Sequence, residues 1–209
     1  MIPATHKLFV RSKFKQIAKL VHPKSKILDI GCGNGEIRNF FDNHSYFGVD
    51  GKKEFIDSLI KNKIKAEVVD FNKESIPFHK ERFDYVLLLD ILEHVADPES
   101  LLSQAKTRLK EKGKIIITLP NDYHLLNKIR FLFNKHLTED PFAPYGHLHY
   151  FPIRTGEVFL RKNGLRIVNR IIIPPIKPAF VTKIIKKFLA VNFPQPFARD
   201  ILYSCEKVF

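Results

Sequence analysis

The sequence predicts an α/β protein with a doubly wound, mostly parallel sheet, formed by residues 1–209 as a single domain. Three observations predict it. A buried strand runs directly into a glycine-rich turn and a helix at 26–36, apolar stretches alternate with helical patterns, and 83–90 is apolar enough for a central strand covered on both faces. A strand, a tight glycine turn and a helix start form a nucleotide-sized cradle at the carboxyl edge of a parallel sheet. We therefore expect the chain to be organised around 26–36.

Composition limits the class of protein and the partners that it attracts. With 35 basic and 22 acidic residues, the net charge is +13. Such a charge favours nucleic acid, an anionic membrane or an acidic substrate, and a solvated lysine-rich surface is the alternative. Cys32 and Cys205 are too few for a disulfide framework or a zinc site, so we expect buried thiols. We find no signal peptide and no run of 18 apolar residues, from which we expect a cytoplasmic location.

Residues 1–25 are predicted to contain one basic amphipathic helix that ends at Pro23. Its apolar positions recur at helical spacing: Phe14, Ile17, Ala18 and Val21. Four basic residues fall elsewhere on the helical wheel: Arg11, Lys13, Lys15 and Lys19. We expect a packing helix.

The glycine turn argues against a dinucleotide. Dinucleotide-binding turns have the pattern G-x-G-x-x-G, whereas Glu36 stands at the sixth position here, after Gly31, Gly33 and Gly35. A carboxylate at this helix start would repel a pyrophosphate. Asp29 and Glu36 instead frame the turn with negative charge, which suits a ligand that has cationic groups and no phosphate. S-adenosylmethionine, with its sulfonium and amino groups, is such a ligand.

Two motifs resemble one protein family. The stretch KILDIGCGNGE at 26–36 resembles motif I of the class I S-adenosylmethionine-dependent methyltransferases. DILEHVADP at 90–98 resembles a segment of the branch that contains the ubiquinone-biosynthesis O-methyltransferases, and LKEKGKIIITLPN at 109–121 fits the same branch. The resemblance is dense over 25–122 and thin elsewhere. It implies a Rossmann-like, seven-stranded sheet whose last strand, at 201–208, is antiparallel. It also implies that the first helix packs beside the first strand and can close over the cofactor.

A cofactor site is predicted at the strand ends. Asp50 follows the strand 46–49 and lies 17 residues after Gly33, where it can accept hydrogen bonds from ribose hydroxyls. The resemblance places Asp70 and Phe71, after the strand 66–69, at the adenine; the alternative is that Asp70 caps the turn that follows. The full set of predicted cofactor-binding residues is Asp29, Gly31, Cys32, Gly33, Asp50, Asp70, Phe71 and Leu89.

The remaining elements continue the alternation. We predict helices at 35–42, 53–61, 98–112 and 155–162, with Gly113 ending the third and Thr155 capping the fourth. Strands are predicted at 114–119 and 165–173. Because parallel strands cross over right-handedly, their carboxyl ends should line one crevice.

Residues 122–153 lack a regular pattern apart from a short helix at 124–133, which is typical of a substrate loop. A hydroxyl or amine acceptor must lose a proton, and a base that titrates near neutrality favours histidine. We predict His147 as the general base. His149, Tyr145 and Tyr123 are the weaker candidates, and a purely structural hydrogen-bonding role is the alternative.

A metal site is the less favoured alternative near this loop. If a helix begins at Asp90, then Asp90, Glu93 and His94 share one face and could ligate a divalent cation. The related ubiquinone-biosynthesis enzymes carry an E-x-x-E-H arrangement, and Asp90 is one methylene shorter than its first residue. The favoured reading is a structural helix start with no metal.

Residues 174–197 form an insertion in which proline-rich stretches flank a basic amphipathic helix. Its apolar stripe comprises Phe180, Val181, Ile184, Ile185, Phe188 and Leu189. Three lysines occupy the other face: Lys183, Lys186 and Lys187. We expect docking on the protein's own core, since an apolar stripe usually faces a core. The alternative is peripheral contact of 177–191 with an anionic membrane, or a roof over an apolar substrate.

The leading functional hypothesis is methyl transfer from S-adenosylmethionine to a small-molecule or lipid-like acceptor, most simply at oxygen. An RNA methyltransferase is the alternative suggested by the net charge, although we find no N-P-P-Y stretch and no RNA-binding module. A non-catalytic, cofactor-binding partner subunit is a third hypothesis, against which the glycines and strand-end acids argue. A dehydrogenase is disfavoured by Glu36.

Overall fold

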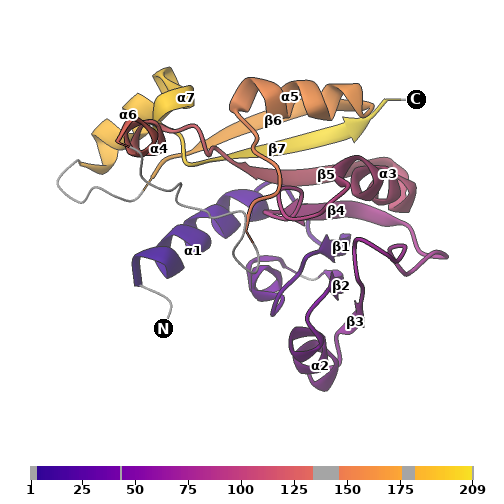
Figure 1. Ribbon diagram of the computed structural model, residues 1–209. Helices are drawn as coiled ribbons and strands as arrows, with labels where there is room; N and C mark the ends of the chain where they lie inside the picture. The colour runs from indigo at the N-terminus through magenta and orange to yellow at the C-terminus, as the bar shows by residue number, and fades with distance from the viewer. Residues whose placement is uncertain (1–3, 43, 134–145, 176–181, 209) are drawn as a thin grey trace.

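The computed structural model describes residues 4–42, 44–133, 146–175 and 182–208. Within these residues, seven strands form a single sheet (Figure 1). The strand order is β3-β2-β1-β4-β5-β7-β6. Strand β7 runs antiparallel to both β5 and β6, while β1 to β5 pair in parallel. The strands are β1 (Lys26–Ile30), β2 (Ser45–Asp50), β3 (Lys65–Val68), β4 (Phe83–Leu89), β5 (Leu109–Pro120), β6 (Leu165–Ile173) and β7 (Asp200–Lys207). The predicted fold class is confirmed.

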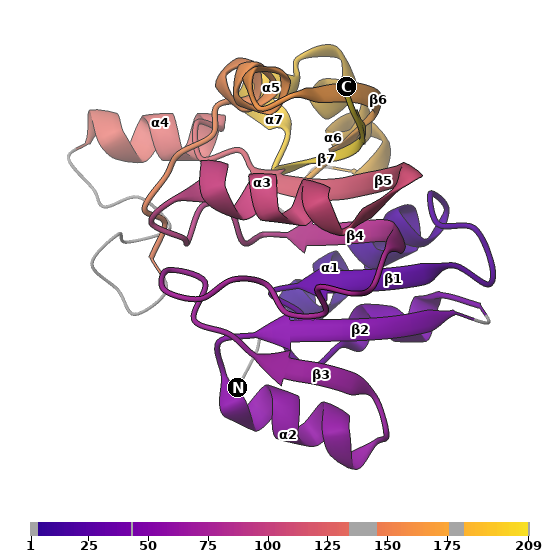
Figure 2. The same cartoon turned by 90° about the vertical axis from the view of Figure 1, so that its right-hand side faces the viewer.

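Helices cover both faces of the sheet, because successive side chains of a strand point to opposite faces. Leu28 and Ile30 of β1 join a core cluster with α3 (Pro98–Arg108) and α5 (Ile153–Lys162). Ile27, from the same strand, joins the opposite cluster with α1 (Ala4–Ala18), η1 (Glu36–Phe40) and α2 (Lys53–Lys61). Figure 2 shows α3 in front of the sheet and α1 behind it. Cys32 and Cys205 are buried free thiols, as expected.

Three of the predicted helices differ from the structure in their bounds or type. Helix α3 ends at Arg108 and not near 112, since the chain becomes extended at Leu109 to pair with Phe83 of β4. Gly113 therefore does not end a helix: it lies in β5, where an added Cβ would stand 2.9 Å from the carbonyl oxygen of Phe83. The helix predicted at 35–42 is the short 3₁₀ helix η1, and α5 begins at Ile153, two residues before Thr155.

Within residues 122–153, the short helix predicted at 124–133 is confirmed. Helix α4 (Leu125–Leu132) follows β5, and the His124 side chain accepts its cap hydrogen bond from the backbone of Asn127. Tyr145 lies outside the described residues, so that candidate base has no structural description.

The insertion forms α6 (Lys183–Asn192) and α7 (Pro194–Phe197). The expectation that its apolar stripe docks on the core is wrong for α6, because Ile184 is 81% and Phe188 is 60% exposed. Among the α6 side chains that the structure describes, Ala190 alone is fully buried. Phe180 and Val181 lie outside the described residues. Within the described ranges, no helix combines the length and apolar character that crossing a bilayer requires.

Candidate active site

The carboxyl ends of the parallel strands meet at one edge of the sheet, as predicted. Two hollows lie along this edge. We call the first the cofactor cavity, of about 250 Å³ at the glycine turn, and the second the reaction cavity, of about 280 Å³ beyond the end of β5. Val10, Lys13 and Asp90 line both hollows, so the two cavities adjoin at these residues.

Five of the eight predicted cofactor residues line the cofactor cavity: Asp29, Gly31, Cys32, Gly33 and Leu89. Gly31 and Gly33 have φ angles of 79° and 51°, in the left-handed region that favours glycine. Apart from the two chain neighbours, no atom of the described residues lies within 4 Å of a Cβ built on Gly33, so the space beside this backbone is open to a ligand. Glu36, which argued against a dinucleotide, also lines the cavity.

Asp50 braces the glycine turn. One carboxylate oxygen accepts a hydrogen bond from the amide of Gly33 at 2.8 Å, and the other accepts from the amide of Lys52 at 2.9 Å. Asp50 does not itself line the cofactor cavity. Its two oxygens offer about four lone-pair sites, so these bonds leave capacity for ribose hydroxyls.

Asp29 is a buried carboxyl in the wall of the cofactor cavity. Its Oδ2 accepts a hydrogen bond from the Tyr46 hydroxyl at 2.5 Å, whereas its buried Oδ1 has no hydrogen-bond partner in the part of the chain that the structure describes. Burial raises the pKa of Asp29 to about 7; the charge of Asp50 adds to this, and the Tyr46 hydrogen bond opposes it. A buried oxygen without a partner beside an open cradle is suited to a cationic donor group.

Asp70 and Phe71 do not line the cofactor cavity. Asp70 accepts a hydrogen bond from the amide of Asn72 at 3.0 Å and pairs with Lys73 at 3.0 Å. Lys73 lowers the pKa of Asp70. Phe71 packs against the core that includes Phe47 and Val69. The structure thus shows the turn-capping role of Asp70, and the adenine role stays a prediction.

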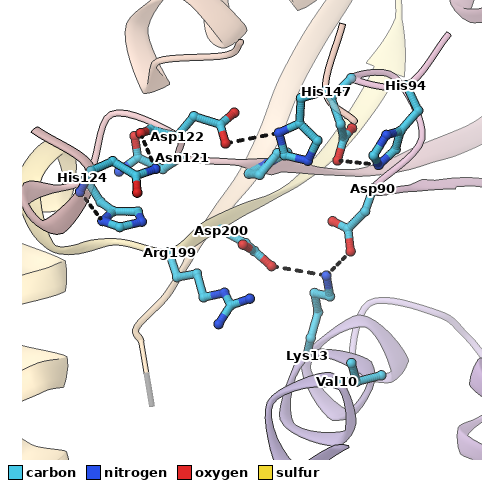
Figure 3. Close-up of a pocket in the computed structure, with 13 residues that line it drawn as sticks. Val10, Lys13, Asp90, His94, Asn121, Asp122, His124, His147, Arg199 and Asp200 are labelled. Carbon is cyan, nitrogen blue, oxygen red and sulfur yellow. Dashed lines mark hydrogen bonds and ion pairs between the residues drawn. The ribbon is translucent and has the colours of Figure 1, made fainter. Parts of the chain in front are cut away.

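Lys13 lines both cavities, and Figure 3 shows its side chain between those of Asp90 and Asp200. The helical wheel placed it away from the apolar stripe, and it is nevertheless only 3% exposed. Its ammonium pairs with Asp90, after β4, and with Asp200, at the start of β7 and 3.1 Å away. Burial alone would lower the pKa of Lys13, but the two carboxylates outweigh it and raise the pKa well above its usual value. This buried charge cluster ties α1 to two strand ends.

Asp90 adopts a left-handed backbone conformation, with φ of 52°. Its amide donates to Oγ1 of Thr118 at 2.9 Å, and the Thr118 hydroxyl donates to the Asp90 carboxylate at 2.6 Å. No helix begins at Asp90, because residues 91–96 form turns and bends and α3 begins only at Pro98. The assumption under which Asp90, Glu93 and His94 share one helical face is therefore wrong.

The reaction cavity contains a histidine–aspartate pair. His147, which the sequence selected, is buried in the wall, and its Nδ1 lies 3.0 Å from Oδ1 of Asp122. Its ring packs edge-on against His94, with centroids 4.9 Å apart. The rival His149 does not line the cavity and has its Nε2 3.3 Å from the carbonyl of Ala96. Tyr123 does not line the cavity either.

Glu93 is 1% exposed and lines the reaction cavity, and neither carboxyl oxygen has a hydrogen-bond partner among the described residues. Burial, with a smaller contribution from Asp90, raises its pKa well above the usual value. The Glu93 carbonyl accepts hydrogen bonds from the amides of Leu148 and His149, at 2.7 and 3.1 Å. Glu93 therefore holds the segment that carries His147 and offers the cavity a carboxyl group.

The structure does not bring Asp90 together with Glu93 and His94 as the alternative metal site required. The Asp90 carboxylate is bound to Lys13 and Thr118. Glu93, His94 and His147 instead each bring one potential ligand atom within 4.8 Å of the others. A metal at these three residues would compete with a proton-accepting role for His147.

Sequence reasoning missed several residues of the reaction cavity, among them Lys13, Asp122, Arg199 and Asp200. Asp122 lies in the loop that was expected to cover the crevice, and its position after a predicted strand was a usable signal. No local pattern marks Asp200, because its role depends on β7 inserting between β5 and β6.

A methyltransferase-domain family model matches residues 5–170 of the chain. A protein of Methanocaldococcus jannaschii, MJ1123, is 36% identical over 107 residues, covering 51% of this chain and 50% of that protein. A ubiquinone biosynthesis O-methyltransferase of Coxiella burnetii is 28% identical, with 52% and 50% covered. A tRNA U34 carboxymethyltransferase of Nautilia profundicola is 27% identical, with 53% and 41% covered. The chain thus spans about half the length of these relatives or less.

Among solved structures, an S-adenosylmethionine-dependent methyltransferase of Methanosarcina mazei superposes with a TM-score of 0.65 and 19% identity. The match covers 93% of this chain and 97% of that protein. At this identity the likeness shows the fold.

Proposed function

The chain belongs to the methyltransferase-domain family, and from that membership we propose that it transfers a methyl group from S-adenosylmethionine to an oxygen of a small-molecule or lipid-like acceptor. The observation that carries the proposal is the junction of the two cavities. One is lined by the glycine turn, the other by His147 and Asp122, and they meet at Val10, Lys13 and Asp90. A donor and an acceptor placed in these hollows would face each other across that junction.

The residues of the cofactor cavity fit S-adenosylmethionine. Asp29 offers its unpartnered oxygen to a positive amino or sulfonium group, and Glu36 adds negative charge at the rim. Asp50 keeps lone pairs for ribose hydroxyls while it holds Gly33. When bound, the cofactor supplies an electrophilic methyl carbon.

His147 is proposed as the base that accepts the acceptor's proton. With Nδ1 donating to Asp122, the ring is fixed in the tautomer whose Nε2 is the proton acceptor. Asp122 also stabilises the imidazolium that forms. Glu93 would hold a hydrogen-bonding group of the acceptor beside the reacting hydroxyl, because its buried carboxyl lines the same wall.

Orientation is the second contribution of the chain. Holding a nucleophile and an electrophile in reactive geometry can supply about 7–11 kcal/mol. The Lys13 cluster fixes the junction between the cavities, because it links α1 to Asp90 and Asp200. We therefore assign Lys13 a positioning role.

We also propose peripheral contact of α6 with an anionic membrane, which would bring a lipid-like acceptor to the site. The exposed side chains of Ile184, Ile185 and Phe188 form the apolar surface, and Lys186 and Lys187 add positive charge. Flotation with vesicles that contain anionic lipid tests this. Replacing both lysines with Glu should abolish flotation, and indifference to these charges would refute the contact.

RNA methylation is the second candidate, favoured by the net charge of +13 and by the tRNA-modifying relative. It predicts salt-sensitive retention on RNA with a steep slope of log affinity against log salt. A non-catalytic partner subunit would bind the cofactor and show no turnover with any acceptor.

Two measurements test the proposed function. S-adenosylhomocysteine at a thousand times its Kd should stabilise the protein by about 4 kcal/mol, whereas NADH should give no shift. Labelled S-adenosylmethionine should then transfer its methyl group in a screen of quinone precursors, hydroxylated lipids, sugars and RNA. Transfer to RNA alone would replace the small-molecule proposal, and cofactor binding without transfer would favour the partner-subunit hypothesis.

A further inference from the structure

A third hollow, which we call the apolar groove, adjoins the reaction cavity. It has a volume of about 280 Å³ and lies between the first turn of α4 and the helices α6 and α7. Leu125, Leu126, Leu189 and Phe197 supply much of its wall. Leu126 is 53% exposed although it is a large apolar side chain, which costs free energy in water. The groove is thus an apolar surface in which Leu126 stays half-exposed.

The groove wall is fixed to the strands that form the reaction cavity. Asn121, at the end of β5, donates two side-chain hydrogen bonds, to the carbonyls of Gln195 at 2.8 Å and Ala198 at 3.0 Å. The backbone amide of Asn121 donates to the carbonyl of Arg199 at 2.7 Å, and the backbone amide of Arg199 donates to the carbonyl of Ile173 at 2.9 Å. The segment after α7 is therefore anchored in place.

The apolar groove meets the reaction cavity at His124 and Arg199, which line both hollows. His124 also caps α4 through its Nδ1. Burial, aided by the charge of Arg199, lowers the pKa of His124, so its imidazole is neutral at physiological pH. The junction consequently combines a neutral ring with one cation beside an apolar wall.

A hollow of about 300 Å³ also adjoins the reaction cavity, at Asp122 and Asn127, on another side of α4. Most of its exposed wall is apolar, but Tyr123, Lys128 and Tyr150 bring polar groups beside Phe131. A hydrocarbon chain bound there would lie beside Asp122 and Lys128, whereas the apolar groove offers a larger apolar surface of leucine, proline and phenylalanine side chains. The apolar groove is the better site for a hydrocarbon chain.

Resting on the proposed function, we propose that the apolar groove binds the hydrocarbon chain of the methyl acceptor. The hydroxyl end of that acceptor then passes His124 and Arg199 and reaches His147 in the reaction cavity. The continuity of the two hollows argues for this occupant, because a chain bound in the groove has its polar end at the junction. The substrate class is therefore a hydroxylated molecule with an apolar tail.

The test uses dansylated undecanoic acid as a fluorescent probe, with dodecanol and hexanol as competitors and no membrane present. Dodecanol should displace the probe at least about a hundredfold better than hexanol, because each buried methylene adds to affinity. Leu126→Trp and Leu189→Trp, which fill the groove, should each weaken probe binding at least about tenfold. Adding dodecanol to the wild type should shift the imidazole NMR signals of His124 and His147.

Leu132→Trp is the matched control, since Leu132 lies on α4, is 82% exposed and does not line the groove. The proposal is overturned if Leu132→Trp weakens probe binding as much as the groove variants do, or if both alcohols displace the probe equally well. It is also overturned if dodecanol binds without shifting the imidazole signals of His124 and His147. Loss of probe binding in Phe131→Ala, with the Trp variants unaffected, would place the chain in the hollow lined by Phe131 and refute the proposal. A thermal shift with S-adenosylhomocysteine in each variant verifies folding. If that shift is missing in the wild type the proposed function fails, while the alcohol results still decide the groove.

Discussion

The cofactor cavity and the reaction cavity share Val10, Lys13 and Asp90 but are built in different ways. Much of the cofactor cavity comes from one continuous stretch, 29–37, which begins at the end of β1. The reaction cavity draws on five separated segments: 10–13, 90–94, 120–127, 147 and 199–200. Backbone conformation shapes the first cavity, whereas side-chain hydrogen bonds and ion pairs between distant elements shape the second.

This difference separates binding from chemistry. A local strand–turn unit keeps its shape when other parts of the chain vary, so the cofactor cavity is a fixed frame. The reaction cavity depends on the Lys13 cluster and the His147–Asp122 pair, each of which joins residues far apart in sequence. Changes in the second cavity should therefore alter turnover or stability while cofactor affinity is retained.

The largest expected effect is on turnover. His147→Ala should lower kcat by about 10²–10⁴-fold, the usual contribution of a general base, with S-adenosylhomocysteine binding unchanged. The measurement is the initial rate with the acceptor found in the screen. His149→Ala is the control, because His149 lies outside the reaction cavity. An unchanged kcat and pH profile in His147→Ala would remove His147 as the base.

A large loss of stability is expected at the junction. Lys13→Met leaves Asp90 and Asp200 without their cation, and breaking a buried ion pair costs about 3–5 kcal/mol in the free energy of unfolding. Urea denaturation measures this. Lys15→Met, at an exposed position of the same helix, should stay within about 0.5 kcal/mol of the wild type. Adding Asp200→Asn to Lys13→Met should restore part of the loss; no restoration would contradict the charge argument.

Cofactor affinity should depend on the hydrogen bonds by which Asp50 holds the glycine turn. Asp50→Ala removes the hydrogen bonds to the amides of Gly33 and Lys52 and any bond to a ribose hydroxyl. At about 1.5–3 kcal/mol for a hydrogen bond to a charged group, the Kd for S-adenosylhomocysteine should rise about a hundredfold. Calorimetric titration provides the Kd. Asp57→Ala, which breaks only an exposed pair with Lys53, should leave it unchanged.

The smallest effect is a pH dependence at Asp29. A cationic ligand favours the ionised carboxylate, and the pKa of about 7 means that this form increases as pH rises from 6 to 8. The Kd for S-adenosylmethionine should therefore fall by up to about tenfold per pH unit below 7 and level off above it. Asp29→Asn should flatten the curve. A steep curve in this variant would assign the dependence to another group.

The stability of the ligand-free protein should have the opposite pH dependence: the Asp29 carboxyl makes the free energy of unfolding fall as pH rises, whereas cofactor affinity increases. The folded pKa of Asp29 lies above the unfolded value of 3.8, so folding takes up a proton between pH 4 and 7. The contribution of Asp29 to stability is present below pH 4 and is lost as pH rises through 7. Thermal melts with and without ligand separate the two trends.

The succession of strands and helices along the chain and the cofactor cavity follow from local patterns in the sequence. Alternating apolar strands, the spacing of Gly31 and Gly33, and the acid at Asp50 all lie within short windows. His147 was found because its residue type suits the chemistry and its loop was expected over the crevice. The boundary at Arg108 was missed because pairing of Leu109 with β4 overrides the helical pattern.

The rest of the reaction cavity depends on packing that no short window contains. Lys13 is buried only because two carboxylates, 77 and 187 residues away, meet it. Helix α6 was expected on the core from its stripe alone, but the periodicity of an apolar stripe does not say whether protein or another apolar phase covers it. Ile184 and Phe188 show the difference.

A crystal structure of the protein with S-adenosylhomocysteine tests the central claim most directly. We predict the ligand in the cofactor cavity, with its amino group near Oδ1 of Asp29 and its sulfur at the junction formed by Lys13 and Asp90, facing His147. A ligand-free cavity at saturating concentration, or a sulfur directed away from the reaction cavity, would contradict the account.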